Sequence, residues 1–286
     1  MSGISPFTSS VASLFTANAG TTDPILSALY GSGTGGAGGV GGTGPVQALN
    51  NAEQMQTQEV NLTSQQPAVA RAIAQFESAV KSATSPAQLL ANPDVMNVLL
   101  TASGMSDQIG FTALATQALL SNPADPNALV NQLTDTRWLT VNQTYNFATQ
   151  GLSVIQTPSV LATIANGYAE QTWYQSLDAT TPGLSEALNF ISQAPSVTSV
   201  SQILGNQTMF DVVTTALGIP QQIVFQDQQA QTQAISAQLD VTRLQDPKYV
   251  QDLADQYMIA MQQQSAATQS SPSLDSLAVQ AAGLVV

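Results

Sequence analysis

The stretch SPAQLLANPDVMNVLLTASGMSDQIGF, residues 85–111, decides the fold because the chain contains it twice. The stretch SVSQILGNQTMFDVVTTALGIPQQIVF, residues 199–225, aligns with it without gaps at a spacing of 114 residues. Most other positions pair apolar with apolar or polar with polar residues, so two homologous copies occur in one chain. The positions that recur identically are Ser85, Gln88, Leu90, Asn92, Val98, Thr101, Ala102, Gly104, Gln108, Ile109 and Phe111.

Each copy carries the signals of a buried central helix. Asn92 suits an N-cap, Pro93 the first helical position and Gly104 the C′ position. Asn206 and Gly218 repeat the two ends in the second copy. The residues between Pro93 and Gly104 leave little polar face, so we expect this helix to be buried. Its apolar residues are Val95, Met96, Val98, Leu99 and Leu100.

The similarity extends to both sides of the block. Upstream, NAEQMQTQEVNLTSQQPAVARAIAQF resembles YAEQTWYQSLDATTPGLSEALNF, and downstream LTDTRW resembles LQDPKY. Apolar residues follow one another at helical spacing in both flanks, and no strand-like alternation of any length occurs. The sequence therefore predicts an all-α protein. The apolar sets are Val69, Ile73, Phe76 and Val80; Leu184, Leu188 and Ile191; Trp138, Val141, Tyr145 and Ala148; and Val250, Leu253, Tyr257 and Ala260.

Two Asp-Pro dipeptides predict further helix starts, at Asp125-Pro126 and at Asp246-Pro247. The chain as a whole divides into four predicted segments. Residues 1–44 are a Gly/Ser/Thr-rich arm, expected to be disordered because it cannot bury enough apolar surface to offset its ordering entropy. Residues 45–152 and 153–264 are two tandem homologous multi-helix modules. Residues 265–286 are a C-terminal tail whose apolar end either packs back on the protein or binds a partner.

The arm ends in YGSGTGGAGGVGGTGP, residues 30–45, in which Gly31, Gly33 and Gly36 have the spacing of a dinucleotide-binding loop. Such a loop needs a preceding strand and a helix that begins within it, and neither is predicted here. A P-loop needs a lysine, and none occurs before Lys81. We therefore interpret the glycine tract as a flexible linker.

Composition excludes several classes of function. The chain has 286 residues, with 18 acidic and 5 basic side chains and a net charge of -13. Nucleic-acid binding requires a basic surface, which this acidic chain lacks. Binding to an anionic membrane surface is disfavoured for the same reason. No apolar run approaches the roughly 20 residues of a membrane span, so no membrane insertion is expected. Cysteine and histidine are absent, which removes thiolate metal sites, disulfides and the commonest general base.

Few residues remain as candidates for chemistry. Asp252 and Asp255 share a predicted helix face, where they form either an acid–base pair or, more simply, a solvated acidic surface. Asp135 with Arg137, and Asp246 with Lys248, predict a helix cap with a local ion pair at a corner of each copy. We assign no catalytic, cofactor-binding or metal-binding residue and do not expect an enzyme. The aromatic residues at helical positions, interpreted as core rather than as a ligand site, are Trp138, Trp173, Tyr249 and Tyr257.

The repeated block and the corner together resemble an uncharacterised family of bacterial proteins, a domain of unknown function common in alphaproteobacteria. The blocks are AQLLANPDVMNVLLTASGM and SQILGNQTMFDVVTTALGI, and the corners are LTDTRW and LQDPKY. This sequence departs from the family pattern at Ser103 and Leu217, where an aromatic residue is usual. The resemblance implies an assembly-type or secreted helical protein, often encoded among flagellar genes. It carries over no catalytic residue.

Three functional hypotheses follow. The first is a non-enzymatic structural or accessory protein of the bacterial flagellum or an export system, acting through helix-mediated contacts with a protein partner. The composition of the chain resembles that of exported filament proteins, and its N-terminus lacks the pattern of a cleaved secretory signal. The alternative is a cytoplasmic helical adaptor that holds a partner helix in an apolar groove between the two copies. The third is an enzyme that uses carboxylates alone.

Overall fold

The computed structural model describes residues 44–270, with side chains as far as residue 267. The predicted N-terminal arm, apart from Gly44, and residues 271–286 of the predicted tail lie outside the described residues. Within them the chain is all-α and has no strand, which confirms the predicted fold class. No described helix combines the length and the apolar character needed to span a membrane.

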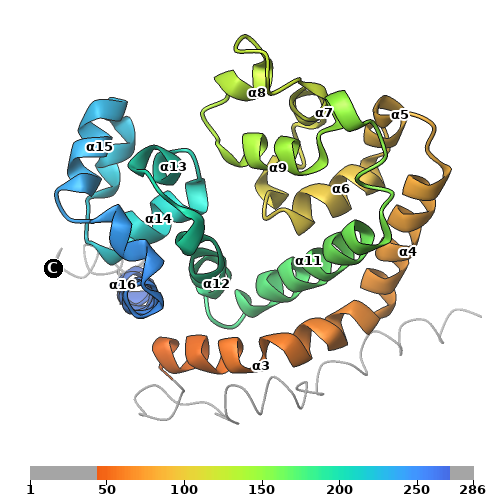
Figure 1. Cartoon of the computed structure of the whole chain (residues 1–286). Helices are drawn as coiled ribbons and strands as arrows, with labels where there is room; N and C mark the ends of the chain where they lie inside the picture. The colour runs from red at the N-terminus through yellow and green to blue at the C-terminus, as the bar shows by residue number, and fades with distance from the viewer. Residues whose placement is uncertain (1–43, 271–286) are drawn as a thin grey trace, which may run out of the picture.

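Two long helices form the base of the molecule, and a group of helices stands at either end of it (Figure 1). The base helices are α3 (Pro45–Gln65) and α11 (Pro158–Leu177). The first group contains α4 (Pro67–Ser82), α5 (Pro86–Leu90), α6 (Pro93–Ala102), η1 (Ser106–Gln108), α7 (Thr112–Leu120), α8 (Leu129–Gln132), α9 (Arg137–Tyr145) and α10 (Phe147–Gln150). The second contains α12 (Leu184–Gln193), η2 (Ala194–Ser196), α13 (Val200–Leu204), α14 (Gln207–Ala216), η3 (Gln221–Phe225), α15 (Gln228–Ser236), η4 (Val241–Gln245) and α16 (Pro247–Ser270).

The described residues form two hydrophobic cores, which do not follow the chain order of the two copies. Leu161 and Ile164, in the first half of α11, belong to the first core with the helices α4 to α9. Trp173 and Leu177, in the second half of α11, belong to the second core with the helices α12 to α16. Leu49 of α3 also lies in the second core, although its position in the sequence assigns it to the first copy. Whether the two copies are separate modules stays a prediction.

The central helix of each copy has the predicted ends. The Asn92 side chain accepts a hydrogen bond from the Asp94 N–H (2.9 Å), and Asn206 accepts one from the Met209 N–H (3.3 Å). Gly104 and Gly218 take positive φ values of 67° and 65°, as the C′ position requires. In both copies the next N–H bonds back to the carbonyl five residues earlier, at 2.8 Å. The five apolar residues singled out in α6 are all buried. The helix predicted from capping signals is therefore confirmed.

Two other expectations about helices were wrong. No helix begins at Asp125-Pro126, because the Asp125 carboxylate accepts the Asn127 N–H (2.9 Å) in a turn and α8 begins only at Leu129. The predicted helix through Ala148 is broken at Asn146, which adopts the left-handed conformation (φ 44°) that asparagine tolerates. The start predicted at Asp246-Pro247 is confirmed by α16, which continues through Ser270.

The two N-cap asparagines provide a matched pair of substitutions. We expect Asn92→Ala to lower the free energy of unfolding by about 1 kcal/mol, the usual cost of losing an N-cap. Asn206→Ala should cost about 2–3 kcal/mol, because Asn206 also donates to the Gln193 side-chain oxygen (2.9 Å) and is almost fully buried. Urea denaturation of both variants measures the difference, and equal losses would contradict the role given to Asn206.

Candidate functional site

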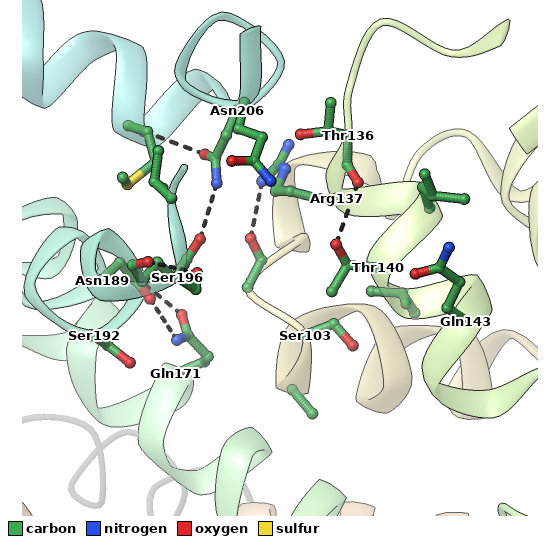
Figure 2. Close-up of a pocket in the computed structure, with 18 of the residues that line it drawn as sticks. Ser103, Thr136, Arg137, Thr140, Gln143, Gln171, Asn189, Ser192, Ser196 and Asn206 are labelled. Atoms are coloured by element: carbon green, nitrogen blue, oxygen red, sulfur yellow. Dashed lines mark hydrogen bonds between the residues drawn. The ribbon is translucent and has the colours of Figure 1, made fainter. Parts of the chain in front are cut away.

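A polar cavity of about 550 Å³ lies between the two groups of helices. Figure 2 shows Arg137, Thr140 and Gln143 on the wall formed by α9, facing Asn189 and Ser192 on the wall formed by α12. Most of the lining consists of neutral amides and hydroxyls, and its charged members are Arg137 and Glu170. The cavity therefore offers hydrogen-bonding groups beside a similar share of apolar surface.

The two walls touch at the corner before α9. The Thr136 N–H donates to the Gly205 carbonyl across the two copies (3.1 Å). A Cβ atom on Gly205 would lie 2.6 Å from the Thr134 carbonyl oxygen, closer than real Cβ contacts allow. The first copy has Ala91 at the equivalent position. Glycine in the second copy thus lets the corner of the first copy approach the end of α13.

Arg137 holds this corner together with every donor of its guanidinium. Its Nε and Nη2 bond to the Asp135 carboxylate (3.0, 3.1 and 2.7 Å). Its Nη1 and Nη2 bond to Asp107 (3.0 and 2.8 Å), and Nη1 also bonds to the Gly104 carbonyl (2.9 Å). The Asp135 carboxylate additionally caps α9 through the Arg137 N–H (3.0 Å). The predicted cap and ion pair are confirmed in the first copy, and Asp107 is a third partner that sequence reasoning missed.

The opposite charges in this cluster favour the protonated form of Arg137 and the ionised form of Asp107. Burial alone would lower the pKa of Arg137, but its hydrogen bonds to the two carboxylates outweigh burial and raise the pKa above the normal arginine value. Burial raises the pKa of Asp107, but the hydrogen bonds and charge of Arg137 outweigh it, and the net pKa is lowered. Because two carboxylates already neutralise the guanidinium, Arg137 is not free to bind an anionic ligand. Its position at the cavity rim is structural.

The corner of the second copy lacks this cluster. The Lys248 N–H donates to Asp246 (3.0 Å), so the cap is present. The exposed Lys248 ammonium forms no salt bridge within the described part of the chain, so the predicted ion pair is absent there. The position equivalent to Asp107 is Gln221, so the second corner also lacks the second carboxylate. Arg243 instead lies over the Tyr249 ring, 3.9 Å from its centre.

A hydrogen-bond network around Glu170, which lines the cavity, connects the two base helices α3 and α11. The Tyr174 hydroxyl donates to the Glu170 carboxylate (2.9 Å), and the Gln56 amide donates to both residues. Burial, followed by the charge of Glu170, raises the pKa of Tyr174 well above its usual value. Tyr174 therefore remains a neutral donor. On the adjacent wall, Gln171 and Asn189 exchange two amide hydrogen bonds (2.6 and 3.3 Å).

Asp252 and Asp255, for which the sequence left an acid–base pair and a solvated acidic surface open, both lie on α16. Asp252 is exposed, while burial and then the charge of Asp252 raise the pKa of Asp255. A closer group, missed at the sequence level, lies at the start of α12. The Ser185 hydroxyl donates to Asp178 and to Glu186 (3.1 Å), and burial, followed by Asp178, raises the pKa of Glu186. The sequence contains no motif that would have predicted this group.

Neither arrangement has the features of a metal site. No group of acidic residues in the described ranges is placed to hold a metal ion. The four aromatic residues predicted to belong to the core all lie in or against it. Trp138, Trp173 and Tyr257 are buried in the two cores, and Tyr249 is half-buried beneath Arg243.

These features define an all-α protein with two cores that share one helix. A family profile described as a protein of unknown function (DUF1217) matches residues 102–250, and the chain belongs to that family. The chain also resembles the crystal structure of a structural-genomics protein from Agrobacterium tumefaciens, with a TM-score of 0.68 and 24% identity. That match covers 80% of this chain and 98% of the other, and it shows the fold alone. No curated protein matches the chain.

Removal of the Arg137 side chain tests the role of the cluster. We expect Arg137→Met to lower the free energy of unfolding by about 2–3 kcal/mol, less than for a fully buried pair because Asp107 is half exposed. The loss arises from two carboxylates left facing each other. The triple variant R137M/D135N/D107N removes that repulsion and should recover much of the loss in urea denaturation. A triple variant no more stable than Arg137→Met would contradict this explanation.

Proposed function

We propose that the protein is a non-enzymatic structural or accessory protein of the bacterial flagellum or an export system, and that it acts through helix-mediated contacts with a protein partner. The observation that carries the proposal is a pair of exposed phenylalanines. Phe111 is 58% exposed and Phe225 is 88% exposed, and they occupy the same position in the two copies. Each comes at the end of the segment that follows the central helix of its copy.

Exposure of both side chains gives up the stabilisation that their burial would provide, in a chain with few aromatic residues. Burying a phenylalanine stabilises a protein by about 1.5–3 kcal/mol, and this chain has eight of them. Large aromatic side chains that stand out from a surface are typical anchors for a protein partner. Their recurrence at one repeat position shows that an exposed apolar anchor is a feature of the repeat itself, whether a separate partner or another segment of the chain contacts it.

The link to the flagellum or to export is supported by the sequence. The family resemblance implies a gene that lies among flagellar genes, and the composition is similar to that of exported filament proteins. The adaptor alternative places a partner helix between the two copies. The cavity found there is lined mostly by neutral polar side chains, and an amphipathic helix would need an apolar groove. The exposed phenylalanines therefore favour partner contacts on the outer surface.

Genetic complementation tests the proposal. We expect deletion of the gene to impair flagellar assembly and swimming, and we expect the wild-type gene to restore both. A Phe111→Ser gene should fail to restore them at equal protein level, because the anchor is lost while the core is unchanged. Leu62→Ser is the matched control, since Leu62 is 40% exposed but lies outside the repeated block. Unchanged assembly and swimming in the deletion strain would contradict the proposal.

A further inference from the structure

We propose that residues 274–285 of the C-terminal tail dock in an apolar groove beside Phe225. The groove has a volume of about 590 Å³ and lies between α14, η3 and α16. Phe210 lies at its base, Val224 and Phe225 form one side, and Tyr257 and Met261 form the other. Val224 and Phe225 are among the most exposed large apolar side chains of the described residues. The rest of the lining is polar, but most of the surface exposed in the groove is apolar, which suits an occupant that is itself apolar.

The connection between the groove and the tail favours the tail as the occupant. Tyr257, Met261 and Gln264 recur at intervals of four and three residues, so one face of α16 forms a wall of the groove. The described part of α16 reaches Ser270, six residues and about 9 Å beyond Gln264. Sixteen residues follow Ser270, and an extended chain of that length reaches about 50 Å. The tail is therefore long enough to turn back along α16.

The sequence of the tail matches the groove. It reads SPSLDSLAVQAAGLVV, residues 271–286, and contains no lysine or arginine. Leu274, Leu277, Ala281 and Leu284 follow one another at intervals of three, four and three residues, the pattern of one apolar helix face. Ser271-Pro272 is a suitable break and restart after α16. The sequence thus predicts a short, mainly apolar segment directly after the helix that lines the groove.

Charge and connectivity argue against a cationic partner as the occupant. Asp211 is the charged residue that lines the groove, and both of its carboxylate oxygens already accept from the Gln207 amide (2.9 Å each). The groove therefore does not require a positive charge on its occupant. A segment tethered to α16 also has a local concentration in the millimolar range, whereas a separate molecule must lose translational freedom to bind.

The docking distinguishes the two equivalent phenylalanines. The tail follows the second copy alone, so it covers the groove beside Phe225 and leaves Phe111 open. Phe111 then remains as the exposed anchor for a separate protein partner, and the docking itself, a contact within one chain, is tested independently of the flagellar proposal.

Because the chain has no cysteine, a single introduced thiol can report on the groove. Gln222→Cys places the thiol in the lining and leaves the apolar residues intact. We expect alkylation of this thiol to be about tenfold faster when Leu277→Asp and Leu284→Asp are added to the full-length chain. Thr112→Cys, an exposed position next to Phe111, is the control, and its rate should not change. Equal rates at Gln222→Cys with and without the tail substitutions would overturn the proposal.

A second measurement identifies which chain supplies the tail. Gln222→Cys and Gln280→Cys are combined in the full-length protein and treated with a short bis-maleimide. We expect a cross-linked monomer, because the tail docks on its own chain. A covalent dimer would show that a second copy supplies the segment, and the absence of any cross-link would show that the groove is empty of the tail. Either of these two results would overturn the proposal.

Discussion

The arrangement of the whole molecule depends on the burial of a single helix, α11, in two different cores. Its first half packs Leu161 and Ile164 into the first core, and its second half packs Trp173, Tyr174 and Leu177 into the second. The two cores therefore cannot move apart without exposing one end of α11 to water. Burial of these large side chains stabilises the protein by about 1.5–3 kcal/mol each, which makes such exposure costly.

The position of the cavity and of its walls follows from the burial of α11 in both cores. Glu170 and Gln171 lie between the two buried ends of α11, and they line the cavity where the helix passes from one core to the other. Helix α3 lies along α11 and is joined to it by the hydrogen bonds of Gln56. Across the cavity, the hydrogen bond from Thr136 to Gly205 connects the corner of the first copy with α13. The polar lining results from two protein surfaces that meet without forming one continuous core.

Much of the local structure could be predicted from the sequence, because capping signals act over a few residues. Asn92, Gly104, Asn206 and Gly218 mark the ends of the central helices, as their side-chain chemistry and backbone freedom require. The repeat at 114 residues also predicted matching helices, and α5 with α13 and α6 with α14 have equivalent ends. Local rules failed at Asn146, where one residue in the left-handed conformation outweighs the helical spacing of its neighbours.

The candidate site could be predicted only in part. The pair Asp135 and Arg137 stood out because the two residues are close in the sequence and recur in the other copy. Asp107 could not be assigned to them, since it lies 30 residues away from Arg137 and its counterpart, Gln221, has no charge. The entry of α3 into the second core was equally hidden, because amphipathic spacing shows that a helix buries one face but not which core receives it.

The sharing of α11 implies that the two cores unfold together. The chain contains two tryptophans, Trp138 in the first core and Trp173 in the second, so Trp138→Phe and Trp173→Phe each leave one core with a fluorescent reporter. In each variant, tryptophan fluorescence and helical circular dichroism should give the same urea midpoint, as one cooperative transition requires. A fluorescence midpoint clearly separate from the circular dichroism transition in either variant would show that the two cores unfold independently, and would contradict the central role of α11.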